Sequence, residues 1–425
     1  MARFVVEGGT ALRGEITPAG NKNSALPLIA ASLLTSEPVI LRNLPRIRDV
    51  RGMLEILVGL GATVEELDAH AVRIDTANVG RTSVDPKLSR EIRTSLLFAG
   101  PLLARFKTVT LGPPGGDVIG RRRNDTHWLV LRALGAELHA EQQGYGLRTD
   151  GLRGADILLD EASVTATENA LLASVLAPGR TVIRNAASEP HVQELAMVLV
   201  QMGARVSGIG TNTLEVKGVE QLRGVEHTIW SDHMEVGSFI GLAAITHGEI
   251  TIHHCAPSHL AMTRAVFKRL GVRTDLDGDD LLVRASDRYV IEDDHGGAIP
   301  KVQSQIWPGF PSDLSSIATA FATQAVGTVL IHEWMFGARM FWVGALEAMG
   351  ARLVLCDPHR VLIVGPAQLY GSELRSPDIR AGLALLGAAL AAKGTSTMDN
   401  VDQIDRGYED IDGRLRALGA RIERV

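Results

Sequence analysis

The chain has 425 residues, a formal net charge of −6 at pH 7, 45% hydrophobic residues and 22% charged residues. This length exceeds one ordinary hydrophobic core and predicts two domains or a repeat array, and the composition excludes a disordered chain. The acidic net charge argues against nonspecific nucleic-acid binding, so an anionic ligand requires local clusters of cations. No stretch approaches the roughly 18 apolar residues of a membrane span, and the N-terminus lacks the apolar core of a signal peptide.

The cysteine and histidine patterns give no sign of a disulfide framework or a metal site. Cys255 and Cys356 are too few for a framework, and no CxxC, HxxxH or HExxH spacing is present. A Gly-x-Ser-x-Gly motif is also missing, which removes the simplest proposal of a nucleophilic serine. We therefore expect a protein of the reducing cytoplasm that uses no metal ion and no other cofactor.

The first candidate site precedes an apolar stretch at 25–34 that is typical of a buried helix. Asn21 and Asn23 are both good N-cap residues, and Lys22 lies where free backbone N–H groups and the helix dipole favour an anion. An ordinary cap beside a surface lysine is the alternative. Two mixed-charge segments follow and are weak signals individually: 46–49 with Arg48, and 90–95 with Arg93.

The segment 113–125 combines two prolines, three glycines, Asp117 and the consecutive arginines 121–123. Its prolines and glycines exclude regular secondary structure and permit close backbone approach to a ligand. Arginine forks bind phosphate and carboxylate with two hydrogen bonds. We expect a loop that closes over a bound anion, and a solvated turn with a surface charge run is the alternative.

Five later segments place an acidic residue at or near an expected helix start. Thr165–Glu168 and Asp232–Glu235 have the spacing of a capping box, and the second lies near the middle of the chain, where we expect it to cross between domains. Asp313 follows a loop rich in proline and glycine, and capping alone explains it. The acid-and-arginine turns 376–381 and 404–409 similarly precede helices.

A helical segment that ends in Leu/Met-Gly-Ala or a close variant, followed by a short strand, recurs six times at intervals of about 70 residues. No GxGxxG motif follows a strand at a helix start, which argues against a Rossmann sheet. Six α/β units in two sets of three predict two similar domains with a cleft between them. The repeated glycines fit the C′ position after a helix and are Gly61, Gly135, Gly203, Gly271, Gly350 and Gly419.

From Phe4 to Val425 the chain resembles the enolpyruvyl transferase family. The resemblance rests on six segments in the right order: 21–27, 115–120, 163–169, 310–313, 378–381 and 404–409. It implies a two-domain inverted α/β barrel with the active site in the inter-domain cleft. The implied domains are 22–230, which carries the loop 113–125, and 1–21 together with 231–425.

The resemblance also implies the reaction. The enolpyruvyl group of phosphoenolpyruvate is transferred to the 3-hydroxyl of UDP-N-acetylglucosamine, and phosphate is released, as the first committed step of peptidoglycan synthesis. Addition to phosphoenolpyruvate needs a proton donor, a base for the acceptor hydroxyl, and cations around phosphate and carboxylate. The implied partners are therefore phosphoenolpyruvate and a UDP-sugar, without nucleic acid or membrane insertion, and the oligomeric state stays open.

By resemblance, Asp313 is the base and Asp117 the proton donor. Lys22, Arg122 and Arg406 hold phosphoenolpyruvate, with Lys22 and Arg406 taking part in catalysis. Arg48 and Arg380 lie nearby, and Asp378 orients the intermediate. The implied contacts with the sugar nucleotide are Asn23, Arg93, Arg122, Arg123, Asn124, Asp125, Thr126, Ser163, Val164, Glu189, Asp313 and Met335.

Asp117 stands where most family members carry a reactive cysteine, although some carry aspartate. Because a carboxylate is a poorer nucleophile than a thiolate, the epoxide antibiotic fosfomycin is expected not to inactivate this protein. Neighbouring arginines lower the pKa of such a carboxyl, whereas desolvation and a bound anionic substrate raise it. A proton donor at Asp117 requires that the second pair of effects prevails.

Other departures from the family pattern concern the acceptor more than the reaction. They lie at 122–127, Glu161, 232–235, 337–340 and Gln403, and several border the expected nucleotide pocket. Two alternatives therefore stay open beside the peptidoglycan reaction. One is an enolpyruvyl transferase that acts on a different nucleotide or sugar nucleotide, and the other is a non-catalytic binding or regulatory member of the fold.

Overall fold

The computed structural model describes residues 2–116, 119–120, 122–141 and 144–425. By its internal contacts the chain divides into two compact units, which we call the N-terminal unit (20–116 and 123–230) and the C-terminal unit (1–19, 117–122 and 231–425). The loop 113–125 was expected within 22–230. Instead, its described residues Ile119, Gly120 and Arg122 group with the C-terminal unit, because they contact the segment that follows β18.

The described strands of the N-terminal unit form three sheets, with the orders β13-β3-β5-β4, β6-β8-β7 and β11-β12-β10-β9. In the first and third sheets, one parallel pair adjoins an antiparallel hairpin. The strands are β3 (Val39–Arg42), β4 (Thr63–Asp68), β5 (Ala71–Asp75), β6 (Thr108–Leu111), β7 (Glu137–Glu141), β8 (Gly144–Arg148), β9 (Asp156–Leu158), β10 (Arg180–Arg184), β11 (Arg205–Ser207), β12 (Thr213–Lys217) and β13 (Val225–Thr228).

Helices form the interior of this unit. Helix α6 packs against α4 and α5, and α1 packs against α2 and α7, so their apolar side chains make one hydrophobic core. The elements are α1 (Lys22–Ala31), η1 (Ser32–Leu34), α2 (Arg48–Leu60), α3 (Pro86–Glu91), η2 (Arg93–Phe98), α4 (Ala99–Phe106), α5 (Asp125–Ala133), α6 (Val164–Ser174) and α7 (Pro190–Gln201).

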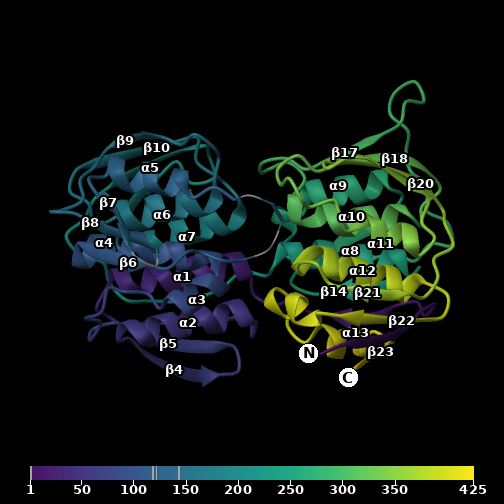
Figure 1. Cartoon of the computed structure of the whole chain (residues 1–425), viewed down its shortest axis with the longest axis horizontal. Coiled ribbons are helices and arrows are strands. Elements are labelled where there is room, and N and C mark those ends of the chain that lie inside the picture. The colour runs from purple at the N-terminus through teal and green to yellow at the C-terminus, as the bar shows by residue number, and fades with distance from the viewer. Residues whose placement is uncertain (1, 117–118, 121, 142–143) are drawn as a thin grey trace. The chain divides into compact units, whose positions relative to one another are not determined.

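The C-terminal unit repeats the same sheet plan three times in its described residues, with the orders β15-β16-β14-β2, β17-β18-β20-β19 and β21-β22-β1-β23. Both ends of the chain enter the third sheet, where β1 lies between β22 and β23 (Figure 1). The strands are β1 (Phe4–Glu7), β2 (Arg13–Ile16), β14 (Glu249–Ile252), β15 (Thr274–Asp277), β16 (Asp280–Val283), β17 (Lys301–Gln303), β18 (Gly327–His332), β19 (Leu353–Asp357), β20 (Arg360–Gly365), β21 (Glu373–Arg375), β22 (Thr395–Asp399) and β23 (Arg421–Arg424).

Three interior helices, α8, α10 and α12, pack on one another in this unit (Figure 1), and each also contacts one sheet. Every residue of α8 is buried, including His233, Glu235 and Ser238 in its first half, and its other residues are apolar or glycine. The helices and 3₁₀ turns are α8 (His233–Ile245), η3 (Pro257–His259), α9 (Ala261–Arg269), η4 (Ser312–Leu314), α10 (Ser315–Ala322), α11 (Val343–Ala348), α12 (Ile379–Ala391), η5 (Val401–Arg406) and α13 (Ile411–Ala417).

The six-fold repeat expected from the sequence is present. Each repeated glycine follows a helix and precedes a strand, and all six have a positive φ between 93° and 108°. That region is open to glycine at little steric cost, which explains why glycine recurs at the end of each unit. The helices lie inside and the sheets outside within each unit, which agrees with the expected inverted α/β barrel.

Local capping signals were correct at some helix starts and wrong at others. Asn21 caps α1 and Asp232 caps α8, each accepting two backbone N–H groups. The expected Thr165–Glu168 box is wrong, because α6 begins at Val164 and Ser163 caps it. Asp313 is not a cap either, because its carboxylate bonds to arginine side chains.

Gly100 in α4 permits the close approach of α6. A Cβ added there would lie 2.7 Å from the Asn169 side-chain oxygen and 2.9 Å from the Asn169 carbonyl oxygen. We expect Gly100→Ala to lower the free energy of unfolding by about 1–3 kcal/mol, as overpacking does. Urea denaturation followed by circular dichroism measures the change.

Gly59 is the matched control, because it is an exposed glycine inside α2 with nothing within 4 Å of an added Cβ. Gly59→Ala should raise stability by ~0.5–1 kcal/mol through helix propensity alone. Equal effects of the two substitutions would contradict the close packing of α4 and α6.

Candidate active site

Asp313, in η4 of the C-terminal unit, is bound by two arginines. Its Oδ1 accepts from Arg339 Nη1 at 2.9 Å and its Oδ2 accepts from Arg380 Nε at 2.9 Å. The side chains of both arginines are 5% exposed or less, whereas that of Asp313 is 28% exposed. Burial by itself raises the pKa of the Asp313 carboxyl, but the two guanidinium groups outweigh it and hold that pKa well below its ordinary value.

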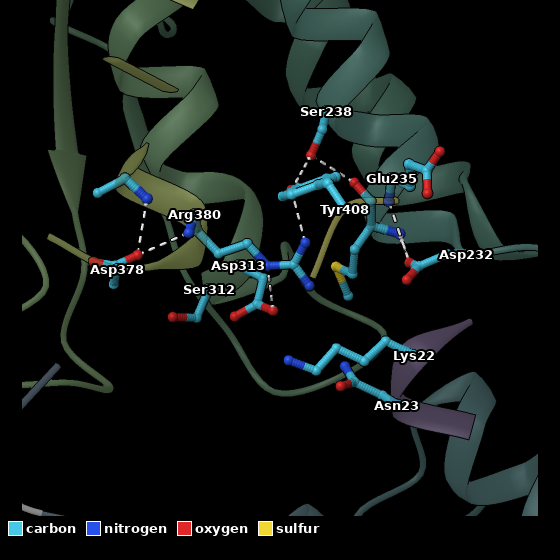
Figure 2. A network of polar contacts seen from close by, with 12 residues as sticks. Lys22, Asn23, Asp232, Glu235, Ser238, Ser312, Asp313, Asp378, Arg380 and Tyr408 are labelled. Atoms are coloured by element: carbon cyan, nitrogen blue, oxygen red, sulfur yellow. Dashed lines mark hydrogen bonds and ion pairs between the residues drawn. The ribbon is translucent and has the colours of Figure 1, made fainter. Parts of the chain in front are cut away.

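A chain of hydrogen bonds connects this carboxylate to α8 (Figure 2). Arg380 Nη1 donates to the Tyr408 hydroxyl at 2.7 Å, and that hydroxyl is 2.8 Å from Ser238 Oγ. The Arg380 guanidinium also lies over the Tyr408 ring, 5.1 Å from its centroid. Burial lowers the pKa of Arg380, but Tyr408 and Asp313 reverse this and raise it well above the ordinary value. Arg380 therefore stays charged and is held on several sides.

The buried carboxylate of Glu333 fixes the residues around the Asp313–Arg339 ion pair. Its Oε2 accepts from Ser312 Oγ at 2.8 Å and from Ser315 Oγ at 3.1 Å, while its Oε1 accepts the Met335 N–H at 2.9 Å. Ser312 Oγ in turn accepts from Arg339 Nη1 at 2.9 Å. One acidic side chain therefore ties η4 to the segment that carries Arg339.

Asp378 and Arg406 lie on neighbouring elements of the same unit. Asp378 caps α12, and its Oδ1 accepts the N–H groups of Arg380 and Ala381 at 2.8 and 2.9 Å. This cap fixes the first turn of the helix that presents Arg380. Arg406, at the end of η5, is 8% exposed, and its Nη1 donates to Gln403 Oε1 at 3.2 Å.

The N-terminal unit carries a second group of expected residues around Lys22, the first residue of α1. Lys22 Nζ lies 2.7 Å from Asp49 Oδ2, and both side chains are largely buried. Asn23 follows on the same helix turn, where Asn21 caps the backbone. Lys22 is thus the first residue of a helix whose N-terminus favours an anion, and Asp49 holds its ammonium group in place.

The segment 122–126 is split between the units, and its part in the N-terminal unit is anchored by Asp160. Arg123 Nη2 donates to Asp160 Oδ2 at 2.9 Å and Thr126 Oγ1 donates to Asp160 Oδ1 at 2.7 Å. Arg123 also pairs with Asp125 at 3.1 Å, and its carbonyl oxygen accepts from Arg93 Nη2 at 2.6 Å. Asn124 precedes α5 at the N-cap position without a capping hydrogen bond from its side chain.

Other expected contacts of this unit lie at the starts of two further helices. Ser163 caps α6 through the Ala166 N–H, Val164 is its first residue, and Glu189 occupies the N-cap position of α7. Burial and the nearby Glu189 carboxylate raise the pKa of Glu168 well above its ordinary value. Arg48 is more exposed and pairs with Glu91 at 3.2 Å.

Sequence reasoning missed several residues that surround Asp313. Arg339 was noted only within a divergent segment, Tyr408 only within a turn motif, and Glu333 and Ser238 were not singled out. The sequence offered one signal for Glu333. It is the single acidic residue between strand β18 and the aromatic segment that begins at Trp334. Asp117 and Arg121 lie outside the described residues, so the proton donor expected at Asp117 stays a prediction.

Within the described ranges, no group of three or more His, Cys, Asp and Glu residues is arranged to hold a metal ion. The helices in those ranges are also too short or too polar to cross a membrane.

Comparison with known proteins defines the class. The family model for EPSP synthase (3-phosphoshikimate 1-carboxyvinyltransferase) matches residues 6–415. In structure the chain is similar to the enolpyruvyl transferase NikO from Streptomyces tendae, with a TM-score of 0.89 and 24% identity over 100% of this chain and 99% of that one. It is also similar to EPSP synthase from Acinetobacter baumannii, with a TM-score of 0.75 and 18% identity over 100% of each chain. These likenesses establish the fold.

The chain therefore belongs to this family of carboxyvinyltransferases and is a transferase. In sequence it is 53% identical to the UDP-N-acetylglucosamine 1-carboxyvinyltransferase of Bradyrhizobium diazoefficiens, over 100% of this chain and 98% of that protein. It is 50% identical to the protein of the same name from Treponema denticola, over 100% of this chain and 99% of the relative.

His233 gives the neighbourhood of Asp313 a measurable dependence on pH. Burial is the main cause that lowers the pKa of His233 to about 4 from the ordinary 6.5. The charges of His259 and Arg380 lower this pKa further, whereas the carboxylates of Asp232 and Asp313 raise it. The unfolded chain therefore binds a proton below about pH 6.5 that the folded chain does not bind until about pH 4. The stability that neutral His233 contributes is present above pH 6.5 and is lost as the pH falls toward 4.

Relative to His233→Gln, the wild type should lose on the order of 3 kcal/mol between about pH 7 and about pH 4, since one unit of pKa difference corresponds to ~1.4 kcal/mol. Urea denaturation of both proteins across this range measures the difference. His295→Gln, at an exposed histidine, is the control and should run parallel to the wild type. A constant gap between wild type and His233→Gln would refute the prediction.

Proposed function

We propose that the protein transfers the enolpyruvyl group of phosphoenolpyruvate to the 3-hydroxyl of UDP-N-acetylglucosamine and releases phosphate, in the first committed step of peptidoglycan synthesis. The observation that carries this proposal is the identity of 50–53% over essentially the full length of relatives named for that reaction. The reducing environment indicated by the cysteine usage supports a cytoplasmic location.

Asp313 is the proposed base for the acceptor hydroxyl. A carboxyl whose pKa is held low is ionised at neutral pH, which is the state required to accept a proton, but it is then a weak base. An anionic substrate that binds Arg380 or Arg339 shares their positive charge with Asp313. The pKa of Asp313 then rises toward its ordinary value, so substrate binding itself strengthens the base.

Lys22, Arg122 and Arg406 are the proposed cations for the phosphate and carboxylate of phosphoenolpyruvate, with Arg48 and Arg380 nearby. Cations fixed before substrate arrives stabilise developing negative charge without reorganising during the reaction. The Lys22–Asp49 and Arg406–Gln403 contacts provide such fixation. Asp117 is the proposed proton donor to the enolpyruvyl methylene carbon, and Asp378 orients the intermediate.

The proposed contacts with the sugar nucleotide are described for each unit by itself. In the N-terminal unit, the starts of α1, α5, α6 and α7 supply backbone N–H groups and polar side chains. Met335 follows Glu333 in the C-terminal unit, and its backbone is fixed by that carboxylate. The proposed set is Asn23, Arg93, Arg122, Arg123, Asn124, Asp125, Thr126, Ser163, Val164, Glu189, Asp313 and Met335.

Neither alternative from the sequence is favoured. The chain is 50–53% identical over its whole length to two relatives that carry the same name, which argues against a different acceptor nucleotide. A non-catalytic descendant is opposed by the same full-length identity to relatives that are named for the transfer reaction.

Phosphate release from phosphoenolpyruvate tests the function. The wild type should release phosphate only when UDP-N-acetylglucosamine is present, and mass spectrometry should find a nucleotide product that carries an added enolpyruvyl group. Asp313→Asn should reduce kcat at least ~100-fold, since general base catalysis contributes about that much or more. Asp287→Asn, at an exposed aspartate, should keep full activity. Release without the nucleotide, or an active Asp313→Asn variant, would contradict the proposal.

Arg339 sets the pH dependence of the same step. Removing its positive charge in Arg339→Gln should raise the pKa of Asp313, so activity should be lost at a higher pH as the medium is acidified. The acid limb of kcat, which reports the substrate complex in which the pKa of Asp313 has risen toward its ordinary value, should therefore move upward relative to the wild type when activity is measured from about pH 3 to about pH 8. Arg132→Gln, at an exposed arginine of α5, should leave that limb in place. An unmoved limb in Arg339→Gln would show that Asp313 is not the group that titrates.

A further inference from the structure

Glu194, in the first half of α7, is a buried acid that the proposed mechanism does not use. Its side chain is 1% exposed. Among the described residues it has three hydrogen-bond partners and no lysine or arginine partner. A buried carboxylate is costly unless it is well hydrogen-bonded. Glu194 and its three partners therefore hold one another in place.

The three partners come from other elements of the N-terminal unit. Ser24 Oγ, in the first turn of α1, donates to Glu194 Oε2. His227 Nε2, in β13, lies 2.8 Å from Glu194 Oε1, and the Trp230 N–H donates to the same oxygen at 2.8 Å. Helices α1 and α7 pack side by side (Figure 1). One carboxylate thus joins α7 to α1, to β13 and to the segment that follows β13.

These contacts close a ring of hydrogen bonds around the start of α1. The Trp230 carbonyl oxygen accepts from the Asn21 N–H at 2.7 Å. Asn21 Oδ1 accepts from the N–H groups of Asn23 and Ser24 at 2.8 and 3.3 Å. Ser24 Oγ then leads back to Glu194. The first turn of α1 is therefore held along its backbone by the Asn21 cap and at its side by Glu194.

This turn carries Lys22 and Asn23, the proposed contacts with phosphoenolpyruvate and with the sugar nucleotide. Asp49 holds the ammonium end of Lys22, whereas the ring of hydrogen bonds holds the backbone from which both side chains project. We propose that Glu194 is a positioning residue, which fixes the first turn of α1 so that Lys22 and Asn23 meet their substrates. This inference rests on the proposed function.

Three substitutions test the hydrogen bonds of Glu194. Glu194→Ala removes the acceptor of all three contacts. Glu194→Gln is the conservative variant, because its carbonyl oxygen can accept from Trp230 and His227 while its amide donates to Ser24 Oγ. Ser24→Ala removes only the contact with α1 and changes the side-chain volume little. Steady-state phosphate release, with each substrate varied in turn, measures KM and kcat.

Thr76→Val is the matched control at the other end of α1. Thr76 is buried, and its hydroxyl donates to the carbonyl oxygens of Ser32 and Thr35, which follow α1, at 3.3 and 2.5 Å. Valine has the same shape without the hydroxyl, so this variant should destabilise the N-terminal unit without moving the first turn of α1. Urea denaturation should show a lower midpoint for both Thr76→Val and Glu194→Ala.

We expect Glu194→Ala to raise the KM for each substrate about threefold or more. Its kcat/KM should fall on the order of tenfold or more, since a displacement of about 1 Å can cost ~100-fold. Ser24→Ala should change both KM values in the same direction but less, and Glu194→Gln and Thr76→Val should stay within about twofold of the wild type. The assays contain no urea and use variants that are folded there, so lower stability by itself leaves KM unchanged.

Hydrogen exchange of the segment 21–27, followed by mass spectrometry, tests the same ring without either substrate. Glu194→Ala and Ser24→Ala should speed exchange of these amides, whereas Thr76→Val should not. Unchanged KM values in Glu194→Ala and Ser24→Ala, or equal changes in Thr76→Val, would overturn the inference. If Glu194→Ala does not fold, Ser24→Ala decides. If the wild type releases no phosphate, the proposed function fails, and exchange still shows whether Glu194 fixes the turn.

Discussion

The ion pairs of Asp313 with Arg339 and Arg380 are the constraint on which the C-terminal unit depends. Two guanidinium groups that are almost fully buried require compensating negative charge and hydrogen-bond acceptors, because an unpaired buried charge is costly. The fold supplies these from separate elements. Glu333, which follows β18, accepts hydrogen bonds from Ser312 and Ser315, and the Tyr408 hydroxyl accepts from Arg380. Moving one of these elements away would separate a buried charged group from a partner that it has in this structure.

In the proposed function, the same constraint prepares the site for an anionic substrate. Arg380 and Arg339 are held in place before substrate binds, so they can stabilise negative charge without the cost of reorganisation. While they bind only Asp313, its carboxylate is a weak base. In the proposed mechanism, substrate and carboxylate compete for the same cations, and this competition couples substrate binding to the strength of the base. In the proposed function, structural ion pairing and catalytic preorganisation are performed by the same residues.

The accuracy of sequence reasoning depended on how local each signal was. The six repeated glycines were read correctly, because helix termination with a positive φ involves only neighbouring residues. The cap at Asp232 was also correct, and of the two candidates left open for α1, Asn21 and Asn23, the structure has Asn21. These signals are local because a capping side chain bonds two or three residues ahead. At α6 the segment contains two acceptable cap residues, Ser163 and Thr165, which the sequence does not distinguish. The prediction therefore used Thr165, whereas Ser163 is the cap in the structure. Asp313 was interpreted as a cap because its position before a helix is a local signal, whereas its true partners Arg339 and Arg380 are far away in the sequence.

The sequence by itself determined the repeat and the class of fold, through local periodicity and through motifs that the family shares, and it proposed most residues of the candidate site. Only the tertiary structure decided which charges meet. Asp313 is separated from Arg339 by 26 residues and from Arg380 by 67. Phe336 meets Arg122 from a different part of the chain. Hydrophobic periodicity specifies which face of each element is buried, but it carries no information about which polar side chains then face each other. Those pairings are set by the packing of different repeat units, where buried charge must be compensated at a distance along the chain.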